Sequence, residues 1–141
     1  MGEWSVKVFG PKHQIEAAVP EAHKTEQPSM PLDKLIAVGL PIALGVVMIG
    51  AGAVNFIGPR SIRASFARWG YPPGFHRVTG GLEITAGLLL LIPATSRAGA
   101  IGSVVILLAA MMTLIRYRDW THLPGAVVLT AVAVAAATIR G

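Results

Sequence analysis

The feature that most constrains this chain is an apolar run of 23 residues, from Leu35 to Ile57, that contains no charged side chain. At 1.5 Å per residue, a helix of this length covers the roughly 30 Å hydrocarbon core of a bilayer. Pro41 falls in its second turn and allows at most a local kink. Only 13% of the residues are charged and 53% are hydrophobic, whereas soluble domains average about 25% charged residues. The sequence therefore predicts an integral membrane protein.

Three shorter apolar segments follow, each near the lower length limit for crossing a bilayer. They cover residues 75–92, 98–115 and 123–139, and short links join them. Short links make consecutive helices antiparallel neighbours. We therefore expect an all-α membrane protein with a four-transmembrane-helix up-down bundle over residues 35–141. Small residues four positions apart, such as Gly39 with Ala43, are expected to let the helices approach closely.

Residues 59–70 predict a short helix after the first span, with Pro59 at its start and Gly70 at its stop. Three turns cannot span a bilayer, so this helix is expected to lie in the membrane interface. Its arginines should reach lipid phosphate and its aromatic side chains should reach acyl chains. The predicted membrane-interface residues are Arg60, Arg63, Phe66, Arg68 and Trp69.

Residues 1–34 predict an extramembrane arm, because they are rich in proline and in polar residues. Apolar and polar side chains alternate over residues 4–9, which is typical of a strand or of a docking segment. Two interpretations of the arm are open: a disordered tail, or a segment ordered against a partner protein.

The basic residues lie at the ends of the apolar segments, where membrane proteins place them. This distribution argues against nucleic-acid binding, which needs a soluble basic face. Six arginines lie on the side of the first–second and third–fourth links, and four Lys or Arg lie on the opposite side. The excess favours both termini outside the cytoplasm.

Glu83 is the one acidic residue inside a predicted span. Placing an ionisable group there costs at least a few kcal/mol, so Glu83 must face the bundle interior or a partner. His76, Gly80 and Gly87 share its helical face. Two interpretations are open: a structural acid that ties helices together, or a ligand or proton site.

The antiparallel order gathers further polar side chains at the end of the bundle that holds His76. A polar cleft open to one face suits an amphiphile such as a quinone, or a docked redox partner, and suits a channel poorly. His122 is either a helix-start or interfacial hydrogen-bonding residue, or a partner of Glu83 in proton transfer. The candidates for ligand binding or proton transfer are Asn55, His76, Glu83, Trp120 and His122.

The sequence carries no GxSxG, P-loop or HExxH motif, and it has no cysteine. Disulfides, iron–sulfur ligation and thiol relays by this chain are therefore excluded. His76, Glu83 and His122 lack the spacing of a metal site. We predict no metal, no catalytic residue and no cofactor, with quinone left open as a ligand, and we favour a protein that is not an enzyme.

Several motifs resemble those of the DoxX-like family of small four-helix membrane proteins, over roughly residues 35–139. The resemblance implies a role in bacterial inner-membrane redox systems, including subunits linked to quinone reduction and partners in thiol homeostasis. It also implies that Glu83 and His122 match the recurrent polar positions of the family. The motifs are Phe66 to Pro72, Gly80-Gly81-Leu82-Glu83, Gly87 to Pro93, Met111-Met112 and Thr121-His122.

The long arm and the lack of cysteine depart from the family pattern, and both favour an accessory protein that docks through residues 1–34. We therefore expect a multi-pass accessory subunit of a membrane oxidoreductase or electron-transfer complex. One alternative is a quinone- or lipid-binding redox enzyme that uses Glu83 and His122. A further alternative is a small-solute carrier.

Overall fold

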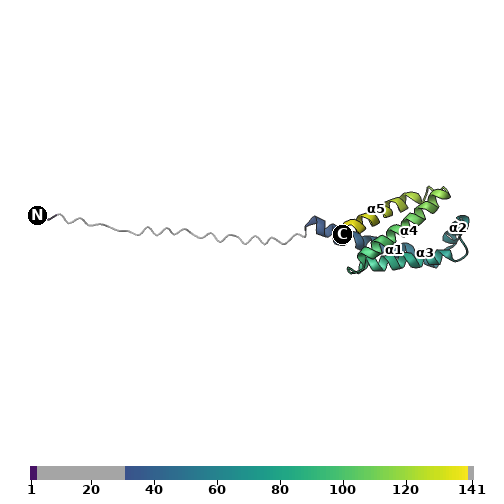
Figure 1. The fold of residues 1–141 in the computed structure, drawn as a ribbon, viewed down its shortest axis with the longest axis horizontal. Coiled ribbons are helices and arrows are strands. Elements are labelled where there is room, and N and C mark those ends of the chain that lie inside the picture. The colour runs from purple at the N-terminus through teal and green to yellow at the C-terminus, as the bar shows by residue number, and fades with distance from the viewer. Residues whose placement is uncertain (3–30, 140–141) are drawn as a thin grey trace.

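The computed structural model describes residues 1–2 and 31–139 (Figure 1). Within these residues the chain forms helices and no strands, which confirms the all-α class. The segment of residues 4–9 and most of the arm lie outside the described residues. The helices are α1 (Leu32–Ile57), α2 (Arg60–Arg68), α3 (Phe75–Leu91), α4 (Ser96–Arg116) and α5 (Leu123–Ile139).

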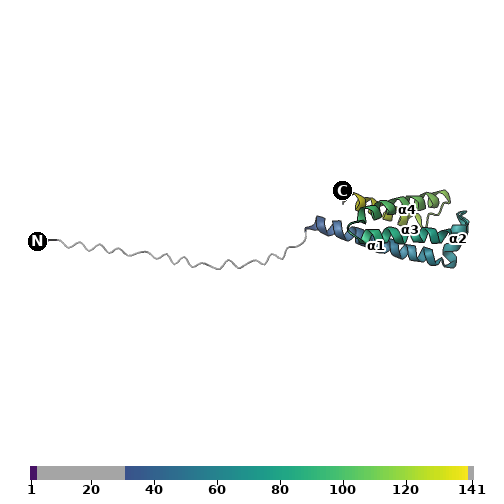
Figure 2. The ribbon, with the colours of Figure 1, turned by 60° about the horizontal axis from the view of Figure 1, so that its bottom comes forward.

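The four long helices lie side by side, and α2 lies at the end of the bundle away from the N-terminus (Figures 1 and 2). Helix α1 packs on α3, α3 on α4 and α4 on α5, and a smaller contact joins α1 to α5. Gly45 of α1 meets Gly87 of α3, and Gly52 meets Gly80, so these two helices run antiparallel. Each of the four long helices therefore lies next to the long helix that follows it in the sequence.

The outer surface of the bundle is apolar. Val46 is 60% exposed, Val105 62% and Val128 62%, and a water-soluble protein rarely shows so continuous an apolar surface. Helices α1 and α4 are long and apolar enough to cross a membrane, and α5 is a shorter apolar helix. These features are typical of a helical membrane protein.

Glycine sets the distance between α1 and α3. A Cβ atom on Gly80 would lie 2.5 Å from the carbonyl oxygen of Gly52, and one on Gly87 would lie 2.7 Å from that of Gly45. The two backbones are therefore in direct contact. The expected role of Gly39 within the bundle is wrong, because a Cβ there would meet nothing within 4 Å. The spacing used is seven residues, which is two helical turns, rather than four.

The helix ends lie within three residues of the predicted ends, and the start of α1 shows the largest shift. Helix α1 begins at Leu32 rather than Leu35, because Pro31 occupies the N-cap and the acidic Asp33 lies in the first turn, where the helix dipole favours it. The arm boundary at residue 34 thus falls inside α1. Gly70 has a φ of 74° and ends the turn after α2, as the sequence predicts.

Candidate functional site

A buried carboxyl group lies at the interface of α1 and α3. Glu83 is only 7% exposed, and its Oε2 accepts a hydrogen bond of 2.7 Å from Nδ2 of Asn55. The glycine contacts described above bring α1 close enough to α3 for this short amide side chain to reach. The bond ties the two helices together within the apolar bundle.

The imidazole of His76 extends this cluster towards α2. His76 is 5% exposed, and its Nδ1 lies 2.8 Å from the backbone oxygen of Asn55. Because a carbonyl oxygen only accepts, Nδ1 carries the proton and donates. Asn55 therefore binds His76 through its backbone and Glu83 through its side chain. The two hydrogen bonds of Asn55 thus connect His76 and Glu83 in one polar cluster.

A second polar cluster joins α2 to the link between α4 and α5, and we call it the clasp. Nη2 of Arg68 lies 2.8 Å from Oδ2 of Asp119, and Nδ1 of His122 lies 2.8 Å from Oδ1. The hydrogen bond from His122, helped by the charge of Arg68, holds the pKa of Asp119 below its ordinary value. The side chains of Arg68 and His122 are 63% and 64% exposed.

The structure thus brings together three of the five predicted site residues: Asn55, His76 and Glu83. Trp120 is 60% exposed, and His122 belongs to the clasp. No hydrogen bond found in the described part of the chain joins either of them to Glu83. In the link that carries them, Arg118 has a left-handed φ of 54°.

Sequence reasoning missed the pairing of Arg68 with Asp119. A signal was available, since Asp119 and Glu83 are the only acids after residue 34. An acid next to several arginines was therefore a candidate for an ion pair. The position of Arg68 in the short interfacial helix instead predicts a contact with lipid phosphate.

Phe66 points into the protein and not into the membrane. It is 8% exposed, and its ring lies 5.3 Å from that of Trp69, 5.7 Å from Tyr71 and 6.1 Å from His76, between centroids. The expectation that this ring contacts acyl chains is therefore wrong, because it closes the end of the bundle. Arg60 and Arg63 of the same helix are exposed, as predicted.

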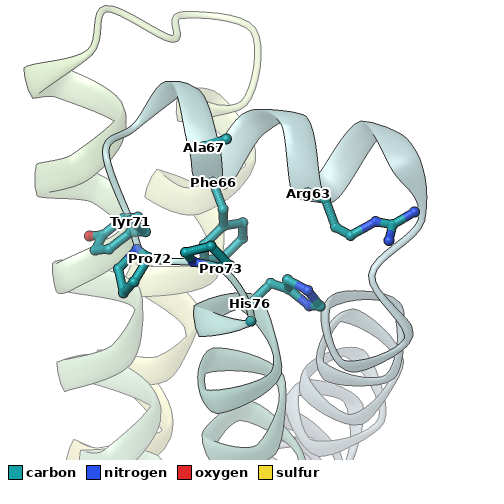
Figure 3. Close-up of a pocket in the computed structure, with 8 residues that line it drawn as sticks. Arg63, Phe66, Ala67, Tyr71, Pro72, Pro73 and His76 are labelled. Atoms are coloured by element: carbon teal, nitrogen blue, oxygen red, sulfur yellow. The ribbon is translucent and has the colours of Figure 1, made fainter.

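A small cavity of about 180 Å³ lies beneath α2. Figure 3 shows Arg63 and His76 on one side of it, and the rings of Phe66, Tyr71 and two prolines on the other. An apolar cavity of about 150 Å³ is large enough to hold a benzene ring. The cavity thus has room for a small ring, and Glu83 does not line it.

The polar clusters do not form a metal centre. Among residues 31–139, no three His, Asp or Glu side chains come together in an arrangement that could hold a metal ion.

An all-helical bundle with an apolar surface, long apolar helices and polar clusters at one end defines a small helical membrane protein. The sequence matches the model of the DoxX-like family over residues 39–136, which is more than half of the chain. The chain belongs to the DoxX-like family. The comparisons with curated proteins and with solved structures gave no match.

Proposed function

We propose that α1, α3, α4 and α5 all cross the membrane and that α2 lies at one surface. The support is the antiparallel packing in chain order and the apolar outer surface. Helices α3 and α5 have 17 residues each, or about 26 Å, close to the shortest length that spans. With both termini outside the cytoplasm of a bacterial inner membrane, α2 faces the cytoplasm.

Single cysteines test this topology, because the chain has none of its own. Ser61→Cys labels α2, and Ala94→Cys labels the exposed link between α3 and α4. An impermeant maleimide added to spheroplasts should modify the Ala94→Cys variant at once and the Ser61→Cys variant only after permeabilisation. Labelling of both variants from the same side would contradict a membrane crossing by α3.

Within that topology, the chain acts as an accessory subunit assembled with a membrane oxidoreductase or electron-transfer complex. The observation that carries this proposal is the outward face of α1. Gly39, Ala43, Val46 and Gly50 follow helical spacing on the side opposite the buried Met48. A Cβ on Gly39 or Gly50 would meet nothing within 4 Å.

Such a face suits another transmembrane helix, because small residues let helix backbones approach closely in lipid. Glycine in a helix costs about 1 kcal/mol relative to alanine, and a helix packed on this face would offset that cost. The family resemblance supports a redox partner, and residues 1–34 are predicted to help dock that partner.

Purification of the tagged chain in mild detergent tests the assembly. A stoichiometric oxidoreductase or electron-transfer subunit should copurify, and Gly50→Leu should release it by placing bulk on the face of α1. Gly81→Leu is the matched control, because a Cβ at Gly81 also meets nothing within 4 Å but lies on α3. A chain that purifies alone, or a partner without a redox role, would contradict the proposal.

The alternative is a quinone- or lipid-binding enzyme that uses Glu83 and His122. The buried Glu83 favours it, but the two residues belong to different hydrogen-bonded clusters. Glu83→Gln keeps an oxygen that can accept the Asn55 hydrogen bond and removes the acid. Loss of quinol-linked turnover in this folded variant would favour the enzyme, and unchanged turnover would remove Glu83 from the mechanism.

A further inference from the structure

A groove runs along the side of the bundle between the turn after α2 and the last turns of α4. Its volume is about 750 Å³, within the usual range of about 300–1,000 Å³ for ligand sites. Trp69 and Tyr71 line one wall, and Met112, Thr113, Arg116 and Tyr117 line the other. Neither the Asn55–Glu83 pair nor the clasp contributes to it.

Two contacts fix the walls of the groove. The hydroxyl groups of Tyr71 and Thr113 lie 2.7 Å apart in a hydrogen bond. The second contact is between Gly70 and Tyr117. A Cβ atom on Gly70 would lie 3.1 Å from the hydroxyl oxygen of Tyr117. The turn after α2 is thus held against α4 at two points, and the groove has a defined shape.

Arg116 supplies a positive charge at one end of the groove. Its guanidinium carbon lies 5.9 Å from the centre of the Tyr117 ring. Among the described residues, no acidic side chain forms an ion pair with it, and the nearby acid Asp119 is bound by Arg68 and His122. The charge of Arg116 is therefore available to an anion from outside the chain.

Trp69 supplies a hydrogen-bond donor that lacks an acceptor. Its Nε1 is buried and has no partner within the described part of the chain. A buried N–H group without an acceptor costs free energy, and native proteins leave few of them. The ring of Trp69 lines the groove, and its Nε1 lies beneath that surface.

The opposite end of the groove is apolar. Met112 is 70% exposed and lies four residues, or one helical turn, before Arg116 on the same face of α4. Along the helix, an exposed apolar side chain at membrane depth is thus followed by a cation at the helix end. This order matches a ligand with an anionic head and an apolar tail.

We propose that this groove binds one anionic phospholipid. The phosphate contacts Arg116, and an acyl chain lies along Met112 and the ring of Trp69. The inference rests on the proposed placement of this end of the bundle at the membrane surface and is independent of the accessory role.

Native mass spectrometry of the full-length protein in detergent tests the site with defined probes. The probes are phosphatidylglycerol and phosphatidylcholine with identical acyl chains, so that only the charge of the head group differs. Retention of one phosphatidylglycerol should exceed that of phosphatidylcholine. Arg116→Gln should weaken it about fivefold, since one arginine near an anionic lipid is worth about 1 kcal/mol and 1.4 kcal/mol is a factor of ten.

Two further variants make the test specific. Trp69→Ala removes the ring that lines the groove, and it should also reduce retention of phosphatidylglycerol. Arg118→Gln removes the same charge two residues further along the chain, at a residue that does not line the groove, and it should leave retention unchanged. A melting curve for each variant separates lost binding from lost folding.

Three results would overturn the site. The first is equal retention of the two lipids, and the second is an equal effect of Arg116→Gln and Arg118→Gln, which would indicate diffuse charge attraction. The third is unchanged binding in Trp69→Ala. Glycerol 1-phosphate is added as a competitor, and its displacement of the lipid at similar concentration would assign the groove to a soluble phosphate instead. None of these results bears on whether a partner subunit copurifies.

Discussion

Two polar clusters hold this bundle together at the same end, and they differ in their surroundings. The Asn55–Glu83 pair lies between α1 and α3, whose backbones touch at glycines. The clasp of Arg68, Asp119 and His122 joins α2 to the link between α4 and α5, and two of its three side chains are mostly exposed. A polar group buried in an apolar interface is costly to leave unpaired, whereas exposed ion pairs are worth little. The first cluster should therefore control stability, and the second should adjust the position of α2.

The largest effect is expected at the glycine contact itself. Gly80→Ala would place a Cβ atom 2.5 Å from the oxygen of Gly52 and force α1 from α3, at a cost of about 1–3 kcal/mol. Gly81→Ala is the control, because it meets nothing and improves helix propensity. Thermal unfolding in detergent should show a lower midpoint for Gly80→Ala only. Equal midpoints would show that the helices do not meet at Gly80.

Asn55→Leu should come next. It leaves the buried Glu83 without its amide donor and should destabilise the protein by about 1–3 kcal/mol. The double variant Asn55→Leu with Glu83→Leu removes both partners and should recover much of that loss, measured by the same unfolding curves. If the double variant were as unstable as the sum of the two single changes, the pair would not be coupled.

The clasp should respond more weakly. Arg68→Ala removes an exposed partner of Asp119 and should cost less than about 1 kcal/mol, and added salt should reduce the difference from the parent. Proteolysis at the turn after α2 is the more sensitive measurement, because a looser α2 exposes this turn. A loss as large as that of Asn55→Leu would invert the ranking of the two clusters.

The smallest effect is a dependence on pH. The pKa of Asp119 is lowered in the folded protein, mainly by the hydrogen bond from His122. The unfolded chain then binds more protons at this residue, so the contribution of Asp119 to stability is present above its ordinary pKa and is lost as pH falls through the folded value. Unfolding midpoints measured downwards from pH 5 should fall less in Asp119→Asn than in the parent. Parallel curves would contradict this contribution.

The helices could be predicted because their signals are local. The apolar segment of residues 123–139 coincides with α5, and the breaker Gly70 ends the turn after α2. The placement of Asn55 at the end of the bundle that holds His76 also followed from the antiparallel order of the helices. The number of membrane crossings and the identity of any ligand stay predictions.

The remaining features depend on contacts between distant segments. Phe66 follows the same helical pattern as an interface residue, and only the turn that returns Tyr71 and His76 over it makes it a buried ring. Gly39 and Gly52 are equally small, but only Gly52 meets a backbone. Periodicity gives the face of a helix but does not say which neighbour covers it.

The pairing of Gly45 with Gly87 and of Gly52 with Gly80 also sets how far α1 extends past its neighbour. Continued along both helices, this register ends α3 opposite Pro41, where the buried residues of α1 begin. Residues 32–40 therefore extend past α3 by about 13 Å at 1.5 Å per residue. Asp33 and Lys34 are charged, so the apolar part of this overhang is residues 35–40, or about 9 Å. In the proposed topology, the molecule presents two hydrophobic thicknesses around its perimeter. The bilayer must change thickness between them, or a neighbouring helix must cover the longer side, and Gly39 lies within that overhang.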